Sequence, residues 1–161
     1  MTPTRHRPGL TLVEAVVSAV IVATMLVAAL TAAGQAARGH LVRARRHVGV
    51  HLARDLLAEI IPRRYREPDD TPSFGPESGE AARTDWDDVD DYDGHAETPP
   101  CDREGAPLAG RDGWRREVAV AFARPDAPDH PAGSDRGLKR ITVTVTAPTG
   151  ERVSLSALRG E

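Results

Sequence analysis

A single apolar run near the N-terminus constrains this chain more than any other feature. Residues 10–33 form 24 consecutive positions in which Glu14 is the only charged residue. As a helix they would extend about 36 Å, which is enough to cross a hydrocarbon core of about 30 Å. A secretory signal has a shorter apolar region of roughly 7–15 residues, so the run predicts a membrane-spanning helix. Cleavage after the small residues 31–33, which would release a secreted domain, is the alternative.

The residues that lead into this run form a more specific pattern. Residues 7–14 read RPGLTLVE: a short basic leader ends in Gly9, and Glu14 is the fifth residue counted from Leu10. This pattern resembles the processing motif of the type IV pilin superfamily, usually Gly-Phe-Thr-Leu-Ile-Glu, from which it departs at Leu10 and Val13. The resemblance implies that a prepilin peptidase cleaves after Gly9 and methylates the new N-terminus at Leu10. It also implies assembly with other pilin or pseudopilin subunits.

Glu14 allows two interpretations. An acid at the centre of a membrane helix costs about 2.5–3.5 kcal/mol, but Glu14 lies in the first turns, where the helix dipole favours a carboxylate. It is therefore either an interfacial acid without a role or the partner of a positive charge within the membrane. The resemblance favours the second interpretation, with the α-amino group of a neighbouring subunit as the partner. Glu14 is then the candidate assembly residue.

The charges that flank the apolar run indicate two opposite orientations. Residues 5–7 carry three arginine or histidine side chains, whereas residues 38–46 carry five. If the flanking charges alone decided the orientation, the positive-inside rule would place the C-terminal flank in the cytoplasm. The resemblance implies the reverse: a single-pass protein of the bacterial cytoplasmic (inner) membrane, with its head outside the cytoplasm and part of a filament when assembled. We follow the motif, because it is more specific than a count of flanking charges.

Composition limits the size and the cross-linking of the part of the chain beyond the span. The chain has 161 residues and a net charge of −3, which allows one small domain beside the membrane helix. Cys101 is the only cysteine, so no intramolecular disulfide can form.

The charges of this part of the chain are separated along the sequence. Residues 38–66 hold eight arginines against two acids, whereas residues 67–104 hold fourteen acids against two arginines. The basic segment contacts anionic lipid headgroups, contacts the acidic segment of a neighbouring chain, or is a solvated helix face.

Residues 34–62 predict an amphipathic continuation of the helix. One apolar stripe recurs every three to four residues, at Leu41, Ala44, Val48, Leu52, Leu56 and Ile60. Pro62 ends the helix, and three glycines, Gly49 among them, are positions where it can bend. We therefore expect a near-continuous helix over residues 10–61, about 78 Å long, whose stripe is covered by a small sheet.

Three segments near the C-terminus predict that sheet, because each alternates apolar with polar side chains. They are residues 114–124, 141–147 and 153–157, and the first places Trp114, Val118, Val120 and Phe122 on one face. They predict an antiparallel meander with one face on the helix. Residues 63–84 and 125–137, rich in Pro, Gly, Asp and Ser, predict loops.

The predicted fold is thus α+β and is organised in four parts. They are a leader at 1–9, a transmembrane helix half at 10–33, an amphipathic helix half at 34–62, and a head at 63–161 with an acidic loop and a three-stranded antiparallel meander.

The acidic loop, residues 85–94 (DWDDVDDYDG), is the second unusual feature. Six of its ten residues are aspartate, which predicts a loop or a single turn. Clustered carboxylates attract calcium, which takes six to eight oxygens, although the EF-hand register fails because Val89 and Pro100 would occupy ligand positions. The candidate calcium ligands are Asp87, Asp88, Asp90, Asp91 and Asp93. The alternative is a solvated loop held by Trp86 and Tyr92. Minor pilins of the mannose-sensitive haemagglutinin type carry a similar run, which adds to the resemblance without assigning the run a role.

No catalytic motif is present in the sequence. It has no G-x-S-x-G elbow and no phosphate-binding glycine loop. His47 and His51 lie one helical turn apart, but Val48 stands where a zinc protease needs glutamate. Acids flank Cys101 and disfavour a thiolate nucleophile. We expect no enzyme, no required cofactor and no nucleic-acid partner.

The sequence therefore predicts a prepilin-like structural subunit. It would be processed and methylated by prepilin peptidase and would join a type IV pilus or a type II secretion pseudopilus, as a minor component because its acidic loop is specialised. The alternative is a membrane-anchored extracytoplasmic binding module that uses the acidic loop, with calcium as its candidate ligand.

Overall fold

A computed structural model describes residues 11–67 and 74–161, with only the backbone described at residues 37–39. Within this part the chain forms a long helix α1, a short 3-10 helix η1 and strands β1 to β5. It divides into two compact units, Met1–Arg43 and Ala44–Glu161. The long helix and the small antiparallel sheet expected from the sequence are both present, which confirms the α+β fold class.

The first unit is helical in its described residues. The helix α1 (Leu12–Ile60) begins there and continues without a break into the second unit. The Thr11 hydroxyl oxygen accepts the Glu14 N–H at 3.2 Å, which satisfies one of the unpaired amides of the first turn. The Thr24 hydroxyl donates to the carbonyl of Ile21 at 2.8 Å, so this polar group is also satisfied within the helix.

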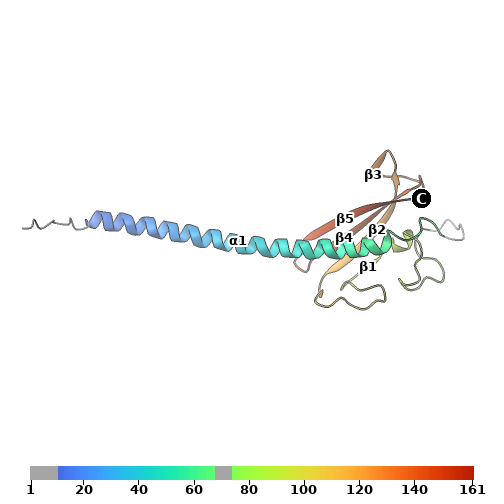
Figure 1. Cartoon of the computed structure of the whole chain (residues 1–161), viewed down its shortest axis with the longest axis horizontal. Coiled ribbons are helices and arrows are strands. Elements are labelled where there is room, and N and C mark those ends of the chain that lie inside the picture. The colour runs from blue at the N-terminus through green and yellow to red at the C-terminus, as the bar shows by residue number, and fades with distance from the viewer. Residues whose placement is uncertain (1–10, 68–73) are drawn as a thin grey trace, which may run out of the picture. The chain divides into compact units, whose positions relative to one another are not determined.

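In the second unit, the C-terminal part of α1 packs on the inner face of the sheet (Figure 1). The end of the predicted stripe forms the core: Leu52, Leu56 and Ile60 are each at most 3% exposed. The helix ends two residues before Pro62, as the proline predicts. Gly49 is a buried contact rather than a bend.

The sheet has the strand order β1-β2-β4-β5, with every pairing antiparallel. Its three main strands are β2 (Arg115–Arg124), β4 (Leu138–Thr146) and β5 (Arg152–Gly160). They lie side by side as the predicted meander (Figure 1), so these three segments were predicted correctly. On the outer face, Thr142 and Thr144 each hydrogen-bond a serine of β5 at 2.9 Å.

Two further strands make the sheet larger than the sequence predicts. The short β1 (Ala96–Glu97) pairs with β2, and β3 (Ala127–Pro131) pairs with the far end of β2. The prediction of a loop over residues 125–137 is therefore wrong at residues 127–131, while the residues on either side of β3 form no strand. An edge strand tolerates proline, and β3 joins β2 where the register shifts between Ala123 and Arg124.

The inner face of β2 and β4 is apolar with two exceptions. Trp114, Val118 and Val120 are buried as predicted, whereas Phe122 is half-buried just before the irregularity in β2. Arg116 and Lys139 are the exceptions, at 2% and 3% exposure. A buried cation needs a hydrogen-bonding or charged partner. The polar sites of the head are therefore found around these two side chains.

Candidate functional site

The predicted processing and assembly residues lie at the start of the chain. Gly9 and Leu10 lie outside the described residues. Glu14 lies in the first turn of α1, with an exposed side chain and its N–H bonded to Thr11. The structure therefore places the acid at the helix N-terminus, where the dipole favours it.

The helix that follows Glu14 is long and apolar enough to cross a membrane. Its apolar side chains are exposed wherever the first unit is described: Leu12 is 83% exposed, Met25 67% and Leu30 66%. A solvated protein surface rarely shows so many contiguous apolar side chains, so this surface needs lipid or other apolar segments to cover it.

The acidic loop is anchored by its aromatic and aliphatic residues. Its single turn, η1 (Asp90–Tyr92), agrees with the predicted loop or turn. Val89 and Tyr92 are fully buried, and the Trp86 ring meets the Tyr92 ring edge-on with centroids 4.8 Å apart. The Tyr92 hydroxyl donates to Glu59 on α1 at 2.9 Å. The loop is thus fixed to the helix, and three of its carboxylates are buried rather than solvated.

Two of these carboxylates hold the backbone of the loop. Asp91 Oδ2 accepts the N–H groups of Asp87 and Asp88, both at 2.9 Å. Asp88 Oδ1 accepts the N–H of Asp90 at 2.7 Å. Burial and a hydrogen bond with the Asp90 carboxyl raise the pKa of Asp88 to about 8. Asp88 thus forms an Asx turn, and Asp91 holds the backbone that precedes it.

The remaining candidate calcium ligands have other partners. Asp90 forms a buried ion pair with Lys139 of β4. Asp93 Oδ1 accepts the N–H of Val120 at 2.7 Å, and Asp87 lies 3.8 Å from Arg64. The five predicted carboxylates therefore face different neighbours and do not gather around one point.

A different set of acids does converge. One carboxylate oxygen from each of Glu67, Glu77, Glu80 and Asp91 lies within 4.8 Å of the others. Glu77 Oε2 is buried there without a hydrogen-bond partner in the described part of the chain. Burial, followed by the neighbouring acids, raises the pKa of Glu80 to about 7, and burial raises the pKa of Asp91. Oxygen-only clusters of this kind suit calcium or magnesium.

Sequence reasoning found only Asp91 of this acidic cluster. Glu67, Glu77 and Glu80 lie in the predicted loop 63–84, spaced without a periodic pattern, so no motif links them to the aspartate run. The high content of acidic residues in this part of the chain was the one available signal. The calcium prediction stays a prediction, and the cluster gives it a location that the sequence did not.

A buried ion-pair network lies beside this cluster. Arg83 contacts Glu59 of α1 and Glu97 of β1, each at 3.0 Å, and Arg116 of β2 also pairs with Glu97. Burial alone would raise the pKa of Glu97, but the hydrogen bond to His95 and the charge of Arg116 hold the pKa below its usual range. The network joins helix, loop and sheet.

The other chemistry-bearing residues do not form a site with these groups. His47 and His51 are exposed on α1. The thiol of Cys101 donates to the carbonyl of Pro99 at 3.3 Å, while the carbonyl of Cys101 accepts hydrogen bonds from Arg83 and Arg116. Cys101 therefore serves the network through its backbone.

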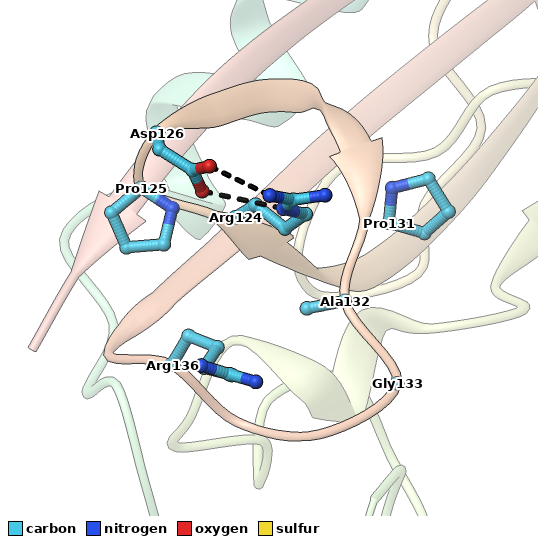
Figure 2. A pocket seen from close by; sticks show the side chains of 7 residues that line it. All are labelled: Arg124, Pro125, Asp126, Pro131, Ala132, Gly133 and Arg136. Atoms are coloured by element: carbon cyan, nitrogen blue, oxygen red, sulfur yellow. Dashed lines mark hydrogen bonds and ion pairs between the residues drawn. The ribbon is translucent and has the colours of Figure 1, made fainter.

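A pocket of about 460 Å³ lies at the β2–β3 hairpin (Figure 2). Arg124 reaches Asp126 with two nitrogens, at 3.3 and 2.7 Å, and both side chains are largely exposed. Arg136 lines the opposite side, and Pro125 and Pro131 form walls. Among the residues that line the pocket, Arg124 and Asp126 form the one acid–base pair.

Comparison with known proteins identifies no relative: no family model, no curated protein and no solved structure matches the chain.

Proposed function

We propose that this chain is a prepilin-like structural subunit. A prepilin peptidase would cleave it after Gly9 and methylate Leu10, and the mature chain would assemble into a type IV pilus or a type II secretion pseudopilus. The observation that carries the proposal is the coincidence of the leader motif with a helix whose apolar half is exposed and whose later half is built into a small head. Such a chain presents one apolar helix for lateral packing and keeps a folded domain outside the membrane.

Glu14 gives the assembly step its chemistry. Cleavage after Gly9 creates a positively charged α-amino group four residues before Glu14. In an apolar layer both charges are costly when alone, and each becomes tolerable when paired. The α-amino group of one copy and Glu14 of its neighbour would therefore favour packing in one axial register.

The test compares Glu14→Leu with the conservative Glu14→Asp variant in the producing cell. Both should remain in the membrane fraction, because removing an acid from an apolar run favours insertion. Glu14→Leu should be lost from sheared filaments or from cross-linked assemblies, while Glu14→Asp should retain some incorporation. Normal incorporation of Glu14→Leu would show that the acid is only interfacial.

A membrane-anchored binding module is the second candidate, favoured by the acidic cluster of Glu67, Glu77, Glu80 and Asp91. It would keep its leader uncut and would not depend on Glu14 for its location. A secreted domain released after residue 33 is the third. The start of the mature chain separates all three candidates.

A further inference from the structure

Lys139 differs from the other basic residues of this chain in type and in burial. It is the only lysine beside twenty arginines, and it is buried on the inner face of β4. Arginine is the usual choice for a buried ion pair, because its planar fork binds a carboxylate with two parallel hydrogen bonds. Arg116, the other buried cation, contacts Glu97 with two of its nitrogens. At Lys139 the chain instead carries a buried primary amine, which can act as a nucleophile once it loses its proton.

The surroundings of Lys139 exclude water and place a carboxylate against the amine. Its Nζ contacts Asp90 Oδ1, and the two side chains are only 3% and 4% exposed. Nζ also donates to the backbone carbonyl of Tyr65 and lies 4.7 Å from the centre of the Tyr65 ring. The Phe74 ring lies 5.9 Å away. Because Oδ1 is bonded to the carboxyl carbon of Asp90, the amine nitrogen lies beside that carbon.

A second carboxyl completes the group. Asp88 is 3% exposed, and its Oδ1 accepts the backbone N–H of Asp90 at 2.7 Å, which keeps its carboxyl close to Asp90. It can therefore polarise the Asp90 carboxyl and carry a proton away from it. The site holds one amine and two carboxyls, in a setting where a separated ion pair is poorly stabilised.

We propose that Lys139 and Asp90 condense into an intramolecular amide bond between Nζ and the side-chain carboxyl carbon of Asp90. The ammonium first passes a proton to the Asp90 carboxylate, which gives a neutral amine and a neutral acid. The amine lone pair then forms the N–C bond, the C–O bond to the hydroxyl breaks, and one water leaves with the second amine proton. No oxidant or cofactor is required. Holding the groups in contact supplies effective concentrations on the order of 10⁵–10⁸ M, and exclusion of water disfavours the reverse hydrolysis.

The bond would supply a covalent link that this head otherwise lacks. With Cys101 as its only cysteine, the chain cannot form an internal disulfide. The amide would tie η1 of the acidic loop to β4 across 49 positions of the sequence. A closed loop of that length restricts the unfolded chain, as a disulfide does. The proposal does not depend on filament assembly.

Mass spectrometry of the purified full chain tests the proposal. The intact mass should lie one water below the mass calculated for the mature chain. Digestion with trypsin should leave residues 137–140 attached to residues 84–103, because trypsin does not cut after an acylated lysine. Fragmentation must place the branch between Lys139 and Asp90. A linear peptide that has lost water at Asp93–Gly94 by forming a cyclic imide would not count as the branch.

Variants separate the bond from a plain ion pair. Lys139→Arg keeps the cation and should restore the full calculated mass, and Asp88→Asn should reduce the cross-linked fraction severalfold. Asp129→Asn, on the exposed part of β3, should leave that fraction unchanged. A wild-type chain of full mass, with free peptides ending at Lys139 after digestion, would overturn the proposal whether or not the variants fold.

Discussion

At the scale of single residues, Gly49 shows how closely the helix approaches the sheet. A Cβ added at Gly49 would lie 3.2 Å from Cγ2 of Val153 and 3.6 Å from the Trp114 ring. Glycine inside a helix costs roughly 1 kcal/mol relative to alanine, so its presence here needs a packing reason. The close approach to Val153 is that reason.

We therefore predict opposite effects for small and large substitutions at Gly49. Gly49→Ala should change stability little, because the gain in helix propensity offsets the crowding of Val153. Gly49→Leu should destabilise the head by about 1–3 kcal/mol through overpacking. Thermal unfolding of the full chain in detergent measures both. Val153→Ala should restore part of the stability lost in Gly49→Leu, and if it does not, the packing account of Gly49 is wrong.

At the scale of elements, the buried ion pairs decide how the head is joined. Glu97 of β1 receives Arg83 from the loop and Arg116 from β2, and Arg83 also holds Glu59 of α1. The strand β1 has only two residues, so its own side chains add little apolar surface to the core. The ion pairs of Glu97 therefore help to hold this strand against β2 and α1.

Glu97→Ala should accordingly destabilise the head by about 3–5 kcal/mol, because it leaves the buried Arg116 without its carboxylate and leaves Arg83 with Glu59 alone. The matched control is Glu117→Ala, which removes a carboxylate of the same sheet that pairs with Arg115 at 2.7 Å on the exposed face. This control should change stability very little. Unfolding by urea gives both values, and equal losses would contradict the assignment of the network.

The acidic cluster predicts a dependence on pH and on divalent cations. The pKa of Glu80 is raised from its ordinary value to about 7, so the folded state binds this proton more tightly than the unfolded state. Its contribution to stability is fully present below about pH 4.5 and is lost as the pH rises through about 7. Above that range, calcium should restore stability as RT ln(1 + [Ca²⁺]/Kd).

Melting curves of wild type and Glu80→Gln across this pH range measure the effect. Glu80→Gln should flatten the pH dependence and weaken the response to calcium, while the exposed control Glu104→Gln should do neither. Magnesium at the same millimolar concentration separates a site from general screening. A melting temperature that rises equally with both ions would end the case for a calcium site.

Element by element, the sequence predicted what periodicity can reveal. The helix, its end before Pro62 and the strands β2, β4 and β5 follow from apolar spacing. The strand β3 was missed because its prolines indicate a loop, and only the pairing with β2 overrides that signal. The acidic cluster was missed because Glu67 and Asp91 come together only after the chain folds. Local patterns therefore located the elements, whereas contacts between distant residues located the site.

At the scale of the whole molecule, the two units differ in how their apolar side chains are covered. In the described residues of the first unit nothing covers the apolar half of α1, whereas the head completes its own core. Such a helix needs lipid or other apolar segments to cover it. We propose that both occur in succession, and that the N-terminus is processed for assembly.

The mass of the N-terminal peptide of the chain purified from its own membranes tests that claim most directly. We predict a mature chain that begins at Leu10 and carries one methyl group on its α-amino nitrogen. Replacement of Gly9 by a bulky residue should leave the chain uncut at this position, which serves as the control for the protease. A wild-type chain that begins near Gly34, or one that keeps residues 1–9 in producing cells, would contradict the account.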